Sequence, residues 1–172
     1  HTSTRWGAVD AMDGPATWAD LFLSRLADAR AQRGVGERLE PRVLAMVEDA
    51  IRLAPSWLGD AGTPTLVHGD VWDGNLMVQP DGDGWRLTGL LDPDLQFADV
   101  EYELAYLQVF DVPRDGFLAA YRRRHALRPG YEQRRLFYWL HTALIHVALF
   151  GDAFFGEFTA RTAESIGRLE PA

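Results

Sequence analysis

Three oxygen-bearing side chains in the middle of the chain have the types and spacing that phosphoryl transfer requires. Asp70 lies in a loop after a short predicted strand at residues 65–67, Asn75 comes five residues later, and Asp92 comes 17 residues after Asn75. Mg²⁺ takes oxygen ligands, few of them from protein, and a carboxylate in a loop can orient an acceptor hydroxyl and take its proton. We therefore expect Asn75 and Asp92 to hold Mg²⁺ and Asp70 to act as the base.

A β-hairpin is the element that must bring these side chains together. Residues 76–78 and 85–91 are predicted strands, and the Asp-Gly-Asp-Gly sequence at residues 81–84 is a strong turn signal. Because a hairpin returns the chain to its starting point, Asp92 should lie close to Asn75. The alternative is that these residues only form turns, in which Asp, Asn and Gly are common. That interpretation must also explain why a strand, a loop, a hairpin and a terminal Asp follow one another.

The segment before this region is predicted to form two helices. Apolar residues recur at helical spacing over residues 18–26, and we expect Gly34 and Gly36 to end that helix. A second helix should begin at Pro41, a residue type favoured in the first turn, and close at residues 54–56.

The segment after the hairpin returns to helical spacing. Asp99 is a candidate N-cap for one helix, and residues 117–121 suggest a second. A long helix should run over residues 129–150 and stop at Gly151, and a final amphipathic helix should cover residues 154–169. Helices, a small central hairpin and further helices together predict an α+β fold.

The composition excludes several kinds of functional site and several kinds of partner. The 172 residues suit a single globular domain, with 47% hydrophobic and 24% charged residues. Cysteine is absent, which excludes disulfides, thiolate metal sites and a cysteine nucleophile. The net charge of −8, with no basic run longer than the arginines at 122–124, argues against a nucleic-acid partner. No apolar stretch is long enough to span a membrane, so we expect no membrane partner and a cytoplasmic location.

The segment at residues 68–75, His-Gly-Asp-Val-Trp-Asp-Gly-Asn, resembles the catalytic loop of the aminoglycoside phosphotransferase-like kinases. The Leu-Asp-Pro sequence at 91–93 resembles the metal-binding segment of that superfamily. Trp72 is typical of its fructosamine (ketosamine) kinase branch, and the likeness is strongest over residues 66–151. The resemblance implies the mainly helical C-terminal lobe of a protein-kinase-like fold, with ATP and Mg²⁺ as cofactors. It implies phosphorylation of a small molecule, most directly a ketosamine on a glycated amine or protein.

The resemblance also implies roles for residues around the base. His68, Gly69 and Trp72 would support the catalytic loop, and Glu103 stands where a shorter Asp commonly braces that loop from a helix. Asp73 stands in place of the usual Ser, where its charge either favours a cationic substrate or is simply solvated.

Further candidates for binding the acceptor lie outside the loop. Asp94 follows the metal-binding segment, and His141 and His146 lie on the long C-terminal helix. The alternative for both histidines is a place in the core or at an interface, because five residues separate them by about 140° around a helix and they cannot share one metal.

The absence of lysine bears on the extent of the kinase. All 17 basic residues are arginine, and the chain begins at His1 rather than Met. Kinases of this type take a lysine and a phosphate-covering loop from an N-terminal nucleotide lobe. We therefore expect residues 1–172 to be one C-terminal catalytic lobe that lacks the nucleotide lobe and has little activity alone. The alternatives are an aminoglycoside or other small-alcohol phosphotransferase, and a non-catalytic, pseudokinase-like binding module.

Overall fold

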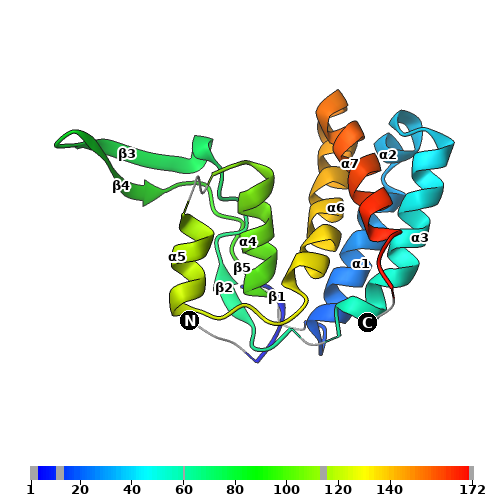
Figure 1. The fold of residues 1–172 in the computed structure, drawn as a ribbon, viewed down its shortest axis with the longest axis horizontal. Coiled ribbons are helices and arrows are strands. Elements are labelled where there is room, and N and C mark those ends of the chain that lie inside the picture. The colour runs from blue at the N-terminus through cyan, green and yellow to red at the C-terminus, as the bar shows by residue number, and fades with distance from the viewer. Residues whose placement is uncertain (1–3, 11–13, 60, 113–115, 171–172) are drawn as a thin grey trace.

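A computed structural model describes residues 4–10, 14–59, 61–112 and 116–170. Within these residues, a larger group of helices forms one side of the molecule, and a smaller group of shorter helices lies with the strands on the other side (Figure 1). The first group comprises α1 (Trp18–Ala31), α2 (Arg33–Arg38), α3 (Pro41–Trp57), α6 (Tyr131–Phe150) and α7 (Ala153–Ile166). The second group comprises α4 (Val100–Val109) and α5 (Phe117–Arg124). The long helix α6 packs against α1, α2, α4 and α7 and so connects the two groups.

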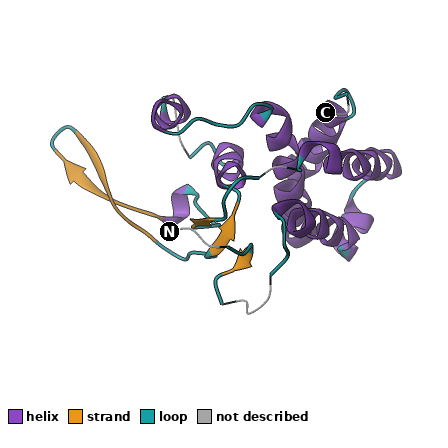
Figure 2. Cartoon of the chain, turned by 90° about the horizontal axis from the view of Figure 1, so that it is seen from below, coloured by secondary structure: helices purple, strands orange, loops and turns teal. Residues whose placement is uncertain are grey.

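The strands of the described residues form two separate antiparallel sheets. The first has the order β1-β5-β2, from β1 (Gly7–Ala8), β5 (Gln96–Ala98) and β2 (Thr65–Val67). The second is the predicted hairpin of β3 (Leu76–Asp81) and β4 (Gly84–Leu90), which extends away from the helices (Figure 2). The predicted α+β class is confirmed. Strands β1 and β5 were not predicted, because they are too short to show an alternating pattern and, unlike the Thr-Leu-Val sequence of β2, contain no apolar run.

Two helix ends differ from the prediction. Helix α1 ends at Ala31, and Gly34 and Gly36 lie inside α2. A Cβ on Gly34 would lie 2.7 Å from the carbonyl oxygen of Ala148, so this glycine permits close packing of α2 on α6 rather than ending a helix. Helix α3 continues through Pro55 to Trp57, where a proline in the last turn removes only one hydrogen bond.

The caps of the C-terminal helices largely follow the prediction. Asp99 caps α4 by accepting a bond from the backbone N–H of Glu101 at 3.1 Å. Gly151 ends α6 in the left-handed conformation, with φ of +66°. Helix α6 begins at Tyr131, two residues later than predicted. Helix α7, capped by Asp152, begins one residue earlier than predicted, at Ala153, and ends three residues earlier, at Ile166.

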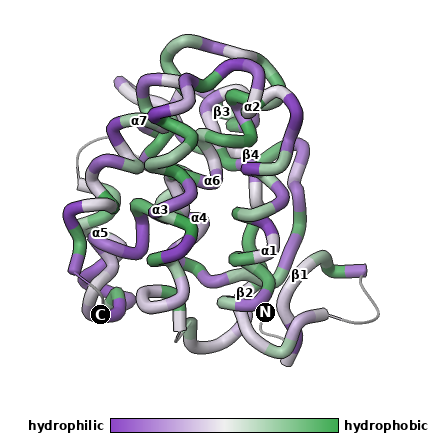
Figure 3. The backbone as a smooth tube through the Cα atoms, turned by 90° about the vertical axis from the view of Figure 1, so that its right-hand side faces the viewer, coloured by the Kyte–Doolittle hydropathy of each residue, from purple (hydrophilic) through white to green (hydrophobic). Residues whose placement is uncertain are grey.

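An aromatic core joins α1, α4 and α6. The rings of Trp18, Phe22, Tyr102 and Tyr138 lie within 4.9–6.3 Å of one another. The indole Nε1 of Trp18 donates to the Tyr138 hydroxyl at 3.1 Å, which satisfies this buried polar group. Hydrophobic and hydrophilic residues alternate along the surrounding helices (Figure 3), so one face of each helix can pack on this core. In the described part of the chain, no helix has the length and apolarity to cross a membrane.

A buried ion network beneath the start of α4 was not predicted. Asp99 and Glu101 are both almost fully buried. Glu101 accepts bonds from Arg134 Nε at 2.8 Å and from Arg128 Nη2 at 2.8 Å, and Asp99 pairs with Arg128 and accepts a bond from the Tyr138 hydroxyl at 2.7 Å. Burial raises the pKa of Asp99, against the opposing effect of Arg128. The network ties the N-terminus of α4 to the start of α6.

Candidate active site

Helix α4 holds the loop that contains the candidate base. The Glu103 carboxylate accepts the backbone N–H of His68 at 3.0 Å and that of Gly69 at 3.1 Å, one on each oxygen. Burial raises the pKa of Glu103, and the two backbone bonds oppose that effect by favouring the ionised form. Because the ion network anchors the same helix, the loop backbone is fixed to a rigid element.

Gly69 brings this loop against the segment that follows Asp92. Its φ is +84°, and a Cβ at this position would lie 2.2 Å from the carbonyl oxygen of Asp94. Only a residue without a Cβ fits both the left-handed conformation and this close approach.

We expect the Gly69→Ala variant to be destabilised, by about 1–3 kcal/mol from the backbone conformation alone and by more once the clash is included. Gly82→Ala is the matched control, because Gly82 also has a positive φ (+60°) but has open space around its Cβ position. Thermal unfolding of both variants measures the difference. Equal losses of stability would mean that the contact with Asp94 does not matter.

The side chain of Asp70 is held by two donors. Its Oδ2 accepts from Asn75 Nδ2 at 2.9 Å, and its Oδ1 accepts from the Tyr106 hydroxyl. The Asn75 amide also donates to the backbone oxygen of Asp70 at 2.9 Å, and Asn75 itself is buried at the end of the 3₁₀ turn Asp73–Asn75. Tyr106 was not predicted, although it lies three residues after Glu103 and therefore on the same face of α4.

The base of the hairpin places Asp92 next to Asn75. The backbone N–H of Leu91 donates to the carbonyl oxygen of Asn75 at 2.9 Å, so Asp92 directly follows this contact. Asp92 is exposed and adopts a φ of +49°, a left-handed conformation that Asp tolerates better than most residues. Among the described residues, nothing donates a hydrogen bond to its carboxylate.

The side chains at this position suit Mg²⁺ better than a metal ion whose ligands all come from protein side chains. The described residues contain no group of three His, Cys, Asp or Glu side chains placed to hold a metal ion. Asn75 and Asp92 instead offer one amide oxygen and one carboxylate. Mg²⁺ in nucleotide sites takes one or two protein ligands and completes its shell with phosphate and water, so these residues fit the ion.

A cavity of about 560 Å³ opens beside Asp70. Asp94, His141 and His146 line it, so the structure brings three predicted acceptor-site residues together with the candidate base. Helix α1 contributes Arg25, Asp28 and Ala29 to the wall, and its C-cap residue Gln32 also lines the cavity. These α1 residues were not predicted, because nothing in their local pattern separates a cavity wall from a solvated helix face.

Two other predicted residues lie outside the lining of this cavity. Asp73 is exposed at the start of the 3₁₀ turn, which agrees with the interpretation that its charge is solvated. Trp72 is 41% exposed, and its ring lies over Gly74, where a Cβ would approach the ring to 2.3 Å. The indole therefore packs on the loop that carries Asp70 and Asn75.

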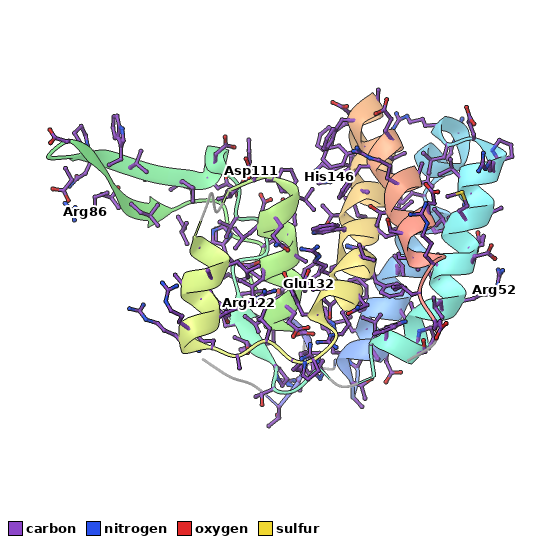
Figure 4. The ribbon with its side chains drawn as sticks, viewed as in Figure 1. Arg52, Arg86, Asp111, Arg122, Glu132 and His146 are labelled. Carbon is purple, nitrogen blue, oxygen red and sulfur yellow. The ribbon has the colours of Figure 1, made fainter. Side chains whose placement is uncertain are left out.

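The two histidines on α6 differ in their surroundings. His146 projects from the side of α6 on which α4 lies (Figure 4), where its ring stacks on Phe155 at 4.3 Å and lies 5.3 Å from Phe110. Its Nδ1 lies 2.8 Å from the carbonyl oxygen of Thr142. His141 is buried, and its Nδ1 has no hydrogen-bond partner among the residues that the structure describes. Burial, followed by the charges of Arg25 and His146, lowers the pKa of His141 to about 3.

The lowered pKa of His141 predicts a loss of stability in acid. Between pH 3 and the usual histidine pKa near 6.5, the unfolded chain binds a proton at this position and the folded chain does not. The contribution of His141 to the free energy of unfolding therefore falls as the pH falls, by up to about 1.4 kcal/mol per pH unit, while the raised pKa values of Asp99 and Glu103 act in the opposite direction. We expect His141→Leu to remove this slope and the exposed His125→Leu to keep it. Urea unfolding from pH 7 to pH 4 measures both, and identical slopes would contradict the prediction.

Comparison with known proteins finds similarity to proteins that are named as kinases. The family model described as fructosamine kinase matches residues 17–166. The "Probable ketoamine kinase slr1563" of Synechocystis sp. is 32% identical over 142 residues, which make up 80% of this chain and 45% of that protein. The chain therefore spans about half the length of such curated relatives.

Two solved structures share the fold. A Thermobifida fusca structure that carries the name fructosamine-3-kinase superposes with a TM-score of 0.67 at 28% identity, over 98% of this chain and 60% of that chain. A structure of aminoglycoside phosphotransferase APH(4)-Ia, in a ternary complex with AMP-PNP and hygromycin B, superposes with a TM-score of 0.65 at 22% identity. That superposition covers 95% of this chain and 56% of the other.

Proposed function

The chain belongs to the fructosamine kinase family, and from this premise we propose that it carries the catalytic centre of an ATP-dependent phosphotransferase acting on a ketosamine hydroxyl. The observation that carries the proposal is the Asp70 carboxylate, held by Asn75 and Tyr106 at the edge of a cavity of about 560 Å³. Phosphoryl transfer needs little covalent chemistry from the protein beyond positioning and charge stabilisation. A fixed carboxylate facing a cavity meets the positioning requirement.

In this proposal Asp70 orients the acceptor hydroxyl and accepts its proton as the hydroxyl oxygen attacks the γ-phosphorus of ATP, while the bond from that phosphorus to the β,γ-bridging oxygen breaks and ADP leaves. Asn75 and Asp92 are the residues that would hold Mg²⁺, which when bound neutralises charge on the transferring phosphate. Glu103 keeps the loop backbone in place through its bonds to His68 and Gly69. The AMP-PNP bound to the aminoglycoside phosphotransferase of the same fold supports ATP as the donor. An ATP-consuming reaction in turn supports the expected cytoplasmic location.

We propose further that residues 1–172 act as the C-terminal lobe of a two-lobed kinase. The hairpin supports this, since it projects from the body and has several half-exposed apolar side chains, including Met77, Val78, Leu87 and Leu90. A second lobe that supplies a lysine and covers the phosphates would pack against such a surface. The absence of lysine from the chain agrees with the same arrangement.

The charge of the cavity favours an acceptor that contains an amine. Asp28, Asp70 and Asp94 line it together with Arg25, so the carboxylates among these residues outnumber the guanidinium. A ketosamine is a secondary amine and is cationic when protonated. An aminoglycoside is the second candidate acceptor, favoured by the same carboxylates and by the hygromycin B bound to the structural relative.

A direct assay separates these functions. The two-lobed protein is incubated with ATP, Mg²⁺ and either a fructosyl amine or hygromycin B, and phosphate transfer is followed by ³¹P NMR. We expect turnover of the fructosyl amine and little turnover of hygromycin B. The reverse preference would favour the aminoglycoside phosphotransferase, and transfer to neither acceptor would favour a non-catalytic binding module.

A further inference from the structure

Tyr106 lies where it can act on the candidate base without belonging to the catalytic loop. It follows Glu103 by three residues on α4, so the two side chains project toward the loop one above the other. Glu103 holds the loop backbone, and the Tyr106 hydroxyl donates to Oδ1 of Asp70. One helix therefore fixes both the backbone and the side chain of the same loop.

The ring of Tyr106 is itself held in place. It packs against Phe110, with the ring centroids 4.7 Å apart, and Trp139 Nε1 donates to the carbonyl oxygen of the neighbouring Ala105 at 2.9 Å. Burial and the nearby Asp70 carboxylate raise the pKa of Tyr106. The hydroxyl therefore keeps its proton and remains a donor at neutral pH.

The two donors reach different oxygens of the carboxylate. Asn75 donates to Oδ2, and Tyr106 donates to Oδ1. A carboxylate offers about four lone-pair positions, so each oxygen can still accept a second bond. With both oxygens held, the carboxylate cannot rotate about its Cβ–Cγ bond without breaking a hydrogen bond, and both Asp70 and Tyr106 line the cavity.

We propose that Tyr106 is a positioning residue for phosphoryl transfer, whose hydroxyl acts with the Asn75 amide to fix the plane of the Asp70 carboxylate toward the acceptor. This inference rests on the proposed function. It assigns Tyr106 an effect on the rate of the chemical step rather than on binding of the acceptor or of ATP.

The Tyr106→Phe variant tests the inference, because it keeps the ring against Phe110 and removes only the hydroxyl. We expect kcat with a fructosyl amine to fall about 10–100-fold, since small misplacements of a reacting group have effects of this size. KM for both substrates and the thermal midpoint should change little. Tyr131→Phe is the matched control, because it removes a tyrosine hydroxyl that bonds Gln108 of the same helix at 2.8 Å, and it should leave kcat unchanged.

Several outcomes would overturn the inference. A rise in KM at constant kcat would mean that the hydroxyl binds the acceptor, and a lowered thermal midpoint with normal kinetics would mean a purely structural role. A wild-type protein that does not phosphorylate the fructosyl amine would instead contradict the proposed function.

A measurement without turnover keeps the inference testable in that case. In the 172-residue chain labelled with ¹³C at aspartate Cγ, the Asp70 signal can be assigned from the Asp70→Asn variant. We expect Tyr106→Phe to shift this signal and Tyr131→Phe to leave it in place. An unchanged Asp70 signal in Tyr106→Phe would overturn the inference whatever the activity of the protein.

Discussion

Replacement of Asp70 by Asn is expected to lower kcat for phosphate transfer by about 10²–10⁴-fold, the usual contribution of a general base. Asparagine has nearly the same shape but cannot accept the proton of the acceptor hydroxyl. Its oxygen can still accept from Asn75, and its amide can donate to the oxygen of Tyr106, whose hydroxyl can rotate. The fold should therefore survive, and the loss should be confined to the chemical step.

Asp73→Asn is the matched control for this variant. Asp73 is an exposed carboxylate in the same loop, three residues from Asp70, and its neutralisation changes the local charge by the same amount. We expect Asp73→Asn to keep kcat within a few-fold of the wild type. Initial rates at saturating ATP and fructosyl amine, with thermal midpoints for both variants, provide the comparison. Equal losses in the two variants would mean that loop charge, rather than a base at Asp70, limits the reaction.

The sequence was sufficient to predict the parts of the site that depend on the succession of neighbouring segments along the chain. A loop, a tight turn and two strands follow one another within 25 residues, so the return of the chain to Asn75 could be inferred from hairpin geometry alone. The N-cap at Asp99 and the stop at Gly151 are local signals of the same kind.

Features that depend on long-range packing could not be predicted in this way. Tyr106 reaches Asp70 across 36 positions of sequence, and Arg134 reaches Glu101 across 33. A tyrosine or arginine on a helix gives no local sign of its partner. The role of Gly34 could not be predicted for the same reason. It depends on the packing of α6, whose Ala148 carbonyl oxygen lies 2.7 Å from the position that a Cβ on Gly34 would take.

Arg134→Ala is expected to be the most damaging substitution for stability, with a loss of about 3–5 kcal/mol in the free energy of unfolding. Arg134 is 7% exposed and Glu101 is 2% exposed. Removal of the guanidinium leaves the Glu101 carboxylate with Arg128 as its remaining partner among the described residues. It also removes donors from the carbonyl oxygens of Pro129 and Arg128, at 2.7 and 3.2 Å, which precede α6. Loss of these part-buried bonds adds to the cost of the lost ion pair, although the Arg128 oxygen still accepts the backbone N–H of Tyr131 at 3.2 Å.

An exposed pair provides the control for Arg134→Ala. Arg33 pairs with Glu37 at 2.6 Å, but its side chain is 89% exposed, so Arg33→Ala should cost no more than about 1 kcal/mol. Arg134→Lys keeps the charge but lacks the planar guanidinium, so its loss in the free energy of unfolding should lie between those of Arg134→Ala and Arg33→Ala. This variant preserves the test if Arg134→Ala does not fold. Urea unfolding at pH 7 measures all three variants.

Because Glu101 and Asp99 hold the start of the helix that carries Glu103 and Tyr106, Arg134→Lys should also lower kcat. A destabilised Arg134→Lys with unchanged kcat would show that the ion network supports the fold without setting the geometry of the catalytic loop.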